Sequence, residues 1–432
     1  MRNKNNSADI SFLGRVISFF RGALIWISEL HLLKRFIDRQ KRLSGYTDSD
    51  SGDDARKSFI FGIVKTVSVT VLCVFLSFVL IFGGKQITYE NAYYMFREIG
   101  YISSYSESRP DTLSYSKPVS NQSFAGFKNG LAVAGDSEIK FFTSTGRATL
   151  TLGSSFSNPK IVTSRDHALI YDQGKKAFSV YNSFIEVYTE NLEYPISFAH
   201  MSDDGSFCVV TRSKSYGSVV RWYDNDFSLI SEYSKNDYVL SSTLSDNGKY
   251  LAVLSLDTAQ GDSVAVLNVL KKGDDEIYST SRLYSFMPYT ASFISSDRIA
   301  VVCDELTAVY DLKGEIKKEI GYSGDLMDTS FIDVGFALLF DENDISAGSV
   351  IRVFDGRGNE QISKKISVDA FDVKLDNNFV YALADGNIRR INRLTGFERE
   401  AALPKGALEV TVLANGEIAV CTQVNAYFAR FD

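Results

Sequence analysis

Histidine and cysteine could support nucleophilic, redox or metal chemistry in this chain, and both are rare. The three histidines, His31, His167 and His200, lie far apart in the sequence. No metalloprotease, P-loop or nucleophile-elbow pattern surrounds them. A Ser-His-Asp triad could assemble from distant positions, but no motif marks one. The sequence therefore predicts no catalytic residue, no metal ligand and no cofactor-binding residue.

The four cysteines leave two interpretations open. Cys73 lies in a long apolar run, whereas Cys208, Cys303 and Cys421 each lie in a short β-type run of a different repeat unit. The three could form a metal or redox cluster, or they could be small buried side chains at equivalent strand positions. We favour burial, because no CxxC or Cys/His spacing is present. Disulfides between separate repeat units also conflict with disulfide geometry.

Two acidic turns carry the other candidate groups. Ser202-Asp203-Asp204-Gly205 and Ser245-Asp246-Asn247-Gly248 contain carboxylates that could serve as catalytic acids or calcium ligands. The same residue types are the ones that tight hairpins prefer, since Asp-Gly and Asn-Gly supply the positive φ angles such turns need. We interpret both segments as hairpin turns.

The elements that would position these residues come from one repeated pattern. A short apolar strand is followed by a tight turn, a strand that ends in an aromatic residue and Asp, and a Gly turn. The pattern is plainest at Ile299–Gly314 and returns at Phe336–Gly356 and Val380–Gly396. Eight apolar second-strand runs align, and their starts are 37 to 49 residues apart. The runs are Leu131–Ala134, Ala168–Tyr171, Phe207–Val210, Tyr250–Leu254, Ile299–Val302, Phe336–Phe340, Val380–Leu383 and Ile418–Cys421.

A repeat of this length predicts an all-β fold, a single β-propeller with one four-stranded blade per unit. Eight blades are favoured, and seven result if the weak first or second unit does not form a full blade. Continuous apolar second strands are typical of strands buried on both faces. Polar fourth strands such as Glu315–Ile320 protect the outer edge. Third strands are expected to end at Tyr223-Asp224, Tyr310-Asp311, Phe354-Asp355 and Phe431-Asp432.

The last repeat unit lacks a fourth strand. It has a first strand at Leu408–Leu413, a second at Glu417–Thr422 and a third at Ala426–Phe431. We expect Thr112–Lys117, just before the first unit, to supply the missing strand. This pairing would join the two ends of the ring, whereas an open ring would expose strand edges.

A long apolar segment precedes the repeats. Phe59–Phe82 holds one charged residue, Lys65, near one end, where its side chain can reach the membrane interface. We expect an uncleaved signal anchor. Lys and Arg are frequent upstream, whereas the next twenty residues hold only Lys85 and Arg97. The positive-inside rule then places the N-terminus in the cytoplasm and the propeller outside the cell membrane, in a single-pass arrangement.

Four parts follow from these features. We expect residues 1–57 to be a cytoplasmic basic tail, 58–84 a transmembrane helix, 85–111 a stalk and 112–432 the β-propeller. In the tail, the helical apolar spacing of Ile10–Ile37 predicts a helix that lies on the membrane surface or, alternatively, packs on a partner. Ser44–Asp54 is expected to be a polar, disordered linker.

Charge narrows the possible partners. Residues 85–432 contain 34 Lys and Arg against 46 Asp and Glu, so this part of the chain is acidic. Such a balance argues against nucleic-acid binding. Trp222 is the only tryptophan after residue 84 and is expected at an outer blade position, so the aromatic stacking around a quinone cofactor is not predicted.

Several segments resemble known propeller repeats. SDDGSFCVV and SDNGKYLAV resemble the Ser-x-Asp-Gly hairpins of WD40-like and TolB-like propellers, and YALADGNIRRINRLTG resembles the quinoprotein-like repeat. Phe397-Glu398 stands where that repeat usually has Trp after Thr-Gly. The layout of residues 57–432 is similar to a family of uncharacterised membrane-anchored β-propellers of Gram-positive bacteria. The resemblance specifies fold and says little about function.

Two functions are compatible with this organisation. The first is a membrane-anchored extracytoplasmic binding or scaffold module, not an enzyme, which presents its loops to a protein or cell-wall partner. The alternative is a hydrolase or lyase with its site in the propeller channel. Clustered Asp or Glu with an Arg pair at the channel mouth would favour the enzyme. A flat, aromatic-rich loop face would favour binding.

Overall fold

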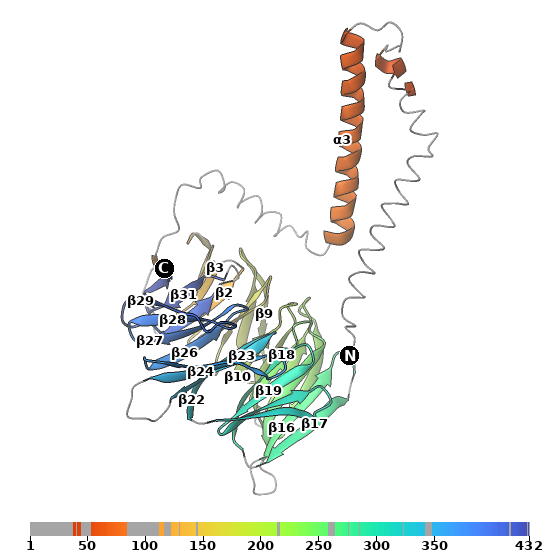
Figure 1. Ribbon diagram of the computed structural model, residues 1–432. Coiled ribbons are helices and arrows are strands. Elements are labelled where there is room, and N and C mark those ends of the chain that lie inside the picture. The colour runs from red at the N-terminus through yellow and green to blue at the C-terminus, as the bar shows by residue number, and fades with distance from the viewer. Residues whose placement is uncertain are drawn as a thin grey trace, which may run out of the picture. The chain divides into compact units, whose positions relative to one another are not determined.

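The computed structural model forms two compact units, residues 1–104 and 105–432 (Figure 1). It describes residues 38–39, 41–44, 53–83, 112–115, 122–128, 130–143, 146–213, 217–257, 264–274, 276–284, 286–322, 324–341, 348–413, 416–429 and 431. The helix expected at Ile10–Ile37 and the stalk expected at residues 85–111 lie outside the described residues, as does most of the expected linker.

The first unit contains helix α3 (Asp53–Gly83), which covers the whole apolar run Phe59–Phe82. The helix begins at an acidic residue, Asp53, where negative charge is favourable next to the positive end of the helix dipole. The expected disordered linker therefore ends earlier than Asp54. Among the described residues, no helix meets the combined length and hydropathy that a membrane span requires.

The second unit consists of eight four-stranded sheets, each an antiparallel blade. Blade 1 contains β2 (Ser123–Phe127), β3 (Gly130–Ala134), β4 (Glu138–Phe142) and β5 (Ala148–Gly153). Blade 2 contains β6 (Pro159–Thr163), β7 (Ala168–Asp172), β8 (Ala177–Tyr181) and β9 (Glu186–Asn191). Blade 3 contains β10 (Ile196–Met201), β11 (Phe207–Thr211), β12 (Ser218–Tyr223) and β13 (Leu229–Lys235). Blade 4 contains β14 (Tyr238–Leu244), β15 (Tyr250–Asp257), β16 (Val264–Lys271) and β17 (Ile277–Tyr284).

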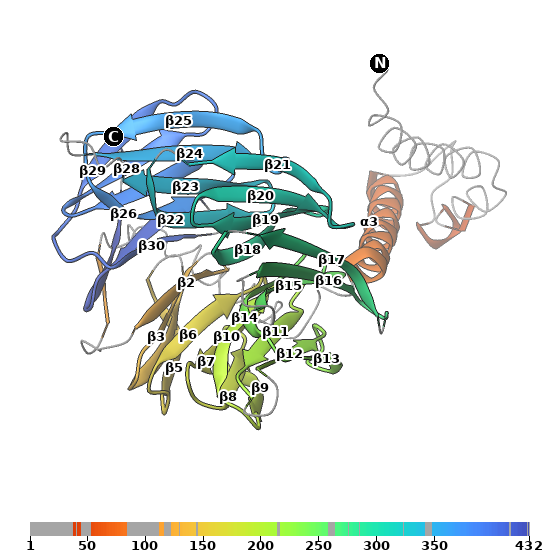
Figure 2. The same ribbon diagram turned by 90° about the horizontal axis from the view of Figure 1, so that it is seen from below.

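The remaining blades continue around the ring, and Figure 2 shows them side by side. Blade 5 contains β18 (Pro288–Ser295), β19 (Arg298–Cys303), β20 (Leu306–Asp311) and β21 (Ile316–Gly321). Blade 6 contains β22 (Asp325–Ile332), β23 (Gly335–Asp341), β24 (Ser349–Asp355) and β25 (Glu360–Ile366). Blade 7 contains β26 (Ala370–Leu375), β27 (Phe379–Ala384), β28 (Asn387–Asn392) and β29 (Glu398–Ala402). Blade 8 contains β30 (Glu409–Val412), β31 (Ile418–Cys421), β32 (Asn425–Phe428) and, from the start of the unit, β1 (Thr112–Ser114).

The eight apolar runs are the second strands of the eight blades, so the prediction of eight rather than seven blades is confirmed. These strands are buried on both faces; every residue of β7 and β11 is buried. Their side chains fill apolar clusters between neighbouring blades. One such cluster joins Leu267 of blade 4 to Ile299 and Tyr310 of blade 5.

The aromatic-Asp pair at the end of a third strand has two structural roles. The ring packs in the core, as in the stacked pairs Phe207–Tyr223 and Phe336–Phe354, with centroids 4.6 and 4.7 Å apart. The carboxylate closes the following turn. Asp355 Oδ1 accepts hydrogen bonds from two backbone N–H groups of that turn, at 2.9 and 2.8 Å. The repeat therefore encodes both blade packing and blade connection.

The last repeat departs from this pattern, and the expected third strand Ala426–Phe431 is wrong at its end. Strand β32 stops at Phe428. The ring of Phe431 instead lies beside Tyr381 and under the guanidinium group of Arg390, 6.2 and 4.4 Å between centres. The reason is that β1 occupies the fourth-strand position of blade 8, so β32 needs no aromatic-Asp pair to close a turn to that strand.

The fourth strand of blade 8 comes from the beginning of the unit, as predicted. Thr112, Leu113 and Ser114 pair antiparallel with Tyr427, Ala426 and Asn425. The Tyr115 N–H also donates to the Val424 carbonyl, at 2.9 Å. The strand ends at Ser114 and is thus shorter than the expected Thr112–Lys117. Leu113 is buried in the cluster between blades 8 and 1.

This closure can be tested through Leu113. We expect Leu113→Ala to lower the free energy of unfolding by about 2–4 kcal/mol, because it leaves a cavity where the two ends of the ring meet. Chemical denaturation of the full chain measures the change. The neighbouring exposed residue provides a control, since Thr112→Ala should change the stability by less than about 0.5 kcal/mol. Equal stability of the two variants would contradict closure through β1.

Candidate functional site

The innermost strand of each blade ends at the same face of the ring, where a hairpin leads to the second strand. Around the axis these hairpins enclose a cavity of about 750 Å³. We call it the channel mouth and define it by the charged residues of its hairpins. They are Lys128, Arg165, Asp203, Asp246, Asp333 and Asp376, from blades 1, 2, 3, 4, 6 and 7.

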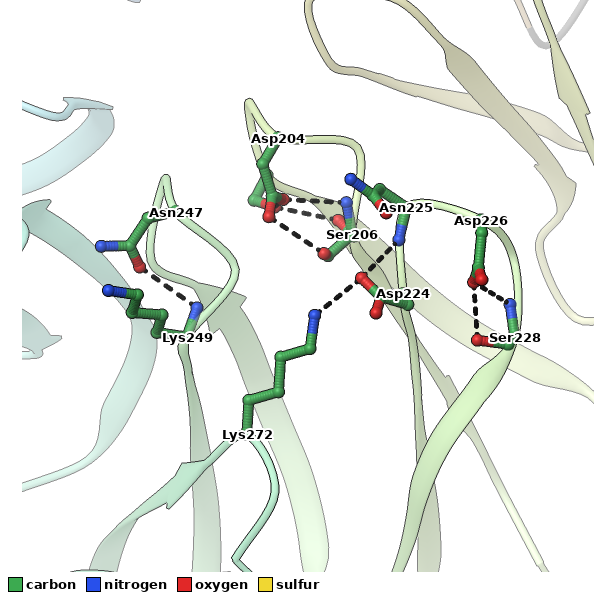
Figure 3. A network of polar contacts seen from close by, with 10 residues as sticks. Asp204, Ser206, Asp224, Asn225, Asp226, Ser228, Asn247, Lys249 and Lys272 are labelled. Atoms are coloured by element: carbon green, nitrogen blue, oxygen red, sulfur yellow. Dashed lines mark hydrogen bonds and ion pairs between the residues drawn. The ribbon is translucent and has the colours of Figure 1, made fainter. Parts of the chain in front are cut away.

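The third residues of the two acidic turns are structural, as the sequence indicated. Asp204 accepts hydrogen bonds from the Ser206 N–H and the Ser202 hydroxyl, at 2.9 and 2.5 Å (Figure 3). Asn247 accepts one from the Lys249 N–H at 3.1 Å (Figure 3). The glycines that follow have φ angles of +91° and +60°, which glycine adopts most readily. Both side chains, Asp204 and Asn247, therefore take part in closing their own turns.

The hairpins of blades 3 and 4 also contact each other. The Asp204 N–H donates to the Asp246 carbonyl at 3.2 Å. A Cβ atom at Gly248 would lie 2.3 Å from Asp204 Oδ2, so only glycine fits there. This close contact fixes the second residues of both turns, Asp203 and Asp246, at the channel mouth.

Three carboxylates of the channel mouth have no partner within the described part of the chain. Asp203, Asp246 and Asp333 make neither a hydrogen bond nor an ion pair through their side chains there. Asp376 differs, because it closes its own turn and accepts from the hydroxyl of Tyr381 at 2.9 Å. Sequence reasoning missed Asp333 and Asp376. For Asp333 the signal was the second position of the hairpin, which holds Asp in blades 3, 4 and 6.

The unpartnered carboxylates affect one another. Burial, together with the nearby charges of Asp333, Asp203 and Asp204, raises the pKa of Asp246 to about 6. Near neutral pH this carboxyl group is therefore in equilibrium between its two protonation states. A cation placed among these residues would relieve both the burial cost and the repulsion.

Positive charge lies on the other side of the channel mouth. Arg165 in blade 2 is exposed and, among the described residues, makes no ion pair. Lys128 in blade 1 lies over the ring of Phe127, 5.7 Å from its centroid. The mouth thus has a cationic side at blades 1 and 2 and an anionic side at blades 3, 4, 6 and 7. It holds clustered Asp residues but a single Arg rather than an Arg pair.

The histidines do not assemble with these groups into a catalytic unit. His200 Nδ1 accepts from the Leu244 N–H at 3.3 Å, and burial lowers the pKa of this imidazole to about 4. It is therefore a neutral packing residue between blades 3 and 4. The ring of His167 packs edge-on against Phe227, with centroids 5.2 Å apart. His31 lies outside the described residues.

The three cysteines of the propeller are buried in different apolar clusters, in agreement with the structural interpretation. Cys208 packs near Trp222, Cys303 lies between blades 4 and 5, and Cys421 between blades 8 and 1. Burial raises the pKa of these thiols to about 11, 12 and 12. Trp222 is on third strand β12 and fills the interface between blades 3 and 4. Across the described residues, no group of three or more His, Cys, Asp and Glu side chains could hold a metal ion.

Fold and site together define the class of protein: an eight-bladed WD40-like and BamB-like β-propeller with a charged channel mouth. Within this class, the chain belongs to the family of unknown function DUF5711, whose family model matches residues 103–413. No curated protein matches the sequence.

Two solved structures share the fold at low sequence identity. Sqt1 of Saccharomyces cerevisiae has a TM-score of 0.56 and 11% identity, and the match covers 74% of this chain and 98% of that one. BamB from Moraxella catarrhalis has a TM-score of 0.50 and 10% identity, over 75% and 99% of the two chains. At this identity the similarity concerns the fold alone.

The raised pKa of Asp246 predicts a pH-dependent penalty. A carboxyl group whose pKa is higher in the folded than in the unfolded chain destabilises the fold increasingly as the pH rises from about 4 to 6. We expect Asp246→Asn to raise the melting temperature at pH 8, and the gain to shrink as the pH falls below 6. Glu193→Gln, which removes an exposed charge, should show no such pH dependence. Equal melting temperatures of Asp246→Asn and the parent at pH 8 would be inconsistent with this assignment.

Proposed function

We propose that the protein is a membrane-anchored, extracytoplasmic binding module that holds a protein partner at its channel mouth. The observation that carries this proposal is the set of unpartnered carboxylates, Asp203, Asp246 and Asp333, in one cavity of about 750 Å³. A cavity of this volume accommodates a few side chains of a ligand. Leaving carboxylates together without partners costs free energy, so a bound cation would be stabilising.

The arrangement of charge favours a particular kind of protein segment. A Lys or Arg side chain fits the carboxylates of blades 3, 4 and 6. An acidic side chain or a chain carboxylate of the same segment fits the free guanidinium group of Arg165 on the opposite side. A ligand with both charges therefore matches the channel mouth better than a purely basic one. The fold supports this function, because a propeller gathers many loops around one opening.

The proposal predicts which variants lose the partner. A photo-crosslinking amino acid at Asn377, an exposed residue of the mouth, should capture a protein in intact cells. Asp246→Asn combined with Asp333→Asn should reduce the yield about ten-fold or more, because a desolvated charge pair is lost. The yield should also fall between pH 7.5 and 5, since Asp246 becomes protonated.

Glu193→Gln with Glu276→Gln is the matched control. Both side chains are exposed and, within the described residues, lack partners, so the pair removes the same charge elsewhere. A yield that falls equally in both double variants would disprove a role for the channel mouth. Capture of a glycan instead of a protein would identify a cell-envelope polymer as the partner.

A hydrolase or lyase in the channel is the second candidate, and one observation favours it. The pKa of Asp246 is raised to about 6, and a carboxyl group that changes protonation state near neutral pH can serve as a general acid or base. Conversion of the bound ligand distinguishes an enzyme from a binding module. In an enzyme, Asp246→Asn would still capture the ligand but would not convert it.

The membrane anchor rests on the sequence. The apolar run Phe59–Phe82 and the excess of Lys and Arg before it support a single-pass anchor with the propeller outside the cell. This topology predicts that a cysteine introduced at Asp274, in an exposed turn, reacts with a membrane-impermeant maleimide on intact cells. A cysteine at Ser49 should react only after lysis.

The labelling uses the chain with Cys73→Ser as its background. That chain alone should remain unlabelled, because its other three thiols are buried. Labelling of Ser49→Cys on intact cells would reverse the orientation. Labelling of both positions only after lysis would place the propeller inside the cell.

A further inference from the structure

The innermost strands of five successive blades contain the same irregularity. In β10, β14, β18, β22 and β26 the pairing register shifts near the start of the strand, which marks a β-bulge with one inserted residue. The inserted residues are Ser197, Leu240, Tyr289, Met327 and Phe371. All lie at the start of the innermost strand, and thus at the face of the ring opposite the channel mouth.

The bulge changes which side chains face the core. In β26, Ala370 and Val373 both pack in the cluster between blades 6 and 7, although they are three residues apart. A regular strand would put residues two apart on one face. The inserted Phe371 is therefore turned out, and 42% of its surface is exposed. Tyr289 and Met327 are exposed in the same way, by 53% and 52%.

Hydrogen bonds between neighbouring innermost strands place the inserted residues at similar heights along the ring axis. The residue after the bulge is polar in blades 4 to 7, and three of these residues bond to the next innermost strand. Asp328 Oδ2 accepts from the Val373 N–H at 2.8 Å, and the Ser241 hydroxyl donates to the Ala291 carbonyl at 3.1 Å. Leu240, Tyr289, Met327 and Phe371 thus follow one another around this opening. We call these four residues the bulge arc.

The fold explains the bulge but not the apolar residues within it. Blade 3 has the same bulge with Ser197 at the inserted position, so a small polar residue is compatible with the geometry. Large apolar side chains on adjacent strands, exposed by about half, are a common feature of interaction surfaces. Among the described residues, Tyr289, Met327 and Phe371 belong to none of the apolar clusters between blades 4 and 7.

Negative charge surrounds the bulge arc. Among the described residues, the connections and adjoining strand ends of blades 5 to 7 at this face carry six exposed carboxylates. They are Asp304, Glu305, Asp325, Asp341, Asp369 and Asp385. The same described connections and terminal strand residues contain one basic residue, Lys405. A partner with apolar side chains and positive charge would match both properties of the surface.

We infer that the bulge arc docks a protein segment in which large apolar side chains are flanked by Lys or Arg. The apolar side chains cover Tyr289, Met327 and Phe371, and the basic ones face the surrounding carboxylates. An anionic lipid surface does not fit, because the same carboxylates would repel it. This surface is separate from the channel mouth, so it stands whether or not a partner binds there.

The test uses the full chain and two fluorescent peptides, (Lys-Phe-Lys-Leu)₃ and its charge-reversed form (Glu-Phe-Glu-Leu)₃. Fluorescence anisotropy should show binding of the first and not of the second. The triple variant Tyr289→Ser, Met327→Ser and Phe371→Ser should weaken binding at least ten-fold. It follows the chain's own use of serine at position 197, so its melting temperature should remain close to that of the parent.

Two control variants make each outcome decisive. Ile185→Ser, Leu229→Ser and Ile316→Ser remove the same number of exposed apolar side chains outside the bulge arc and should leave the affinity unchanged. Asp246→Asn with Asp333→Asn should also leave it unchanged. Loss of binding in either control with full binding by the bulge-arc variant would overturn the inference, as would equal binding of both peptides.

Discussion

Every blade of this ring has a second strand that is largely buried on both faces, and it can be so only against two neighbouring blades. Each blade depends on these neighbours because every residue of the second strands β7 and β11 is buried, so neither strand has a face in contact with water. A ring is the arrangement that gives each blade two neighbours. Its completion depends on the pairing of three residues of β1 with β32. The interblade clusters, the hairpins and the two openings of the channel are all positioned by that constraint.

The blades could be predicted because they repeat. Continuous apolar runs such as Phe207–Val210 mark strands buried on both faces, and eight such runs give eight blades. The need for a strand from outside the last repeat unit could be predicted, because that unit contains three of the four strands of a blade. The end of β32 could not, because Phe431-Asp432 looks like the third-strand ends elsewhere. Phe431 has a different role because the fourth strand of its blade is β1, which comes from the other end of the propeller.

The candidate sites were harder to predict, for different physical reasons. Asp203 and Asp204 are adjacent in sequence, yet one side chain closes its turn and the other has no partner. The two residues are of the same type, so their different roles follow from their positions in the hairpin. The β-bulges are harder still, because an inserted residue leaves no distinctive residue type. Phe371 follows the start of a strand like any core residue, and only the register with β27 shows that it faces outward.

The shared blade 8 also determines when this protein can finish folding. Strand β1 is among the first parts of the propeller to be synthesised, and its partner β32 is among the last; the hydrogen bond from Ser114 to Asn425 spans 311 residues. A growing chain can assemble its middle blades in order, but β1 has no partner until β32 has been synthesised. Contacts of such long range slow folding and leave strand edges exposed for longer. The ring therefore cannot close during synthesis before β32 is available to pair with β1.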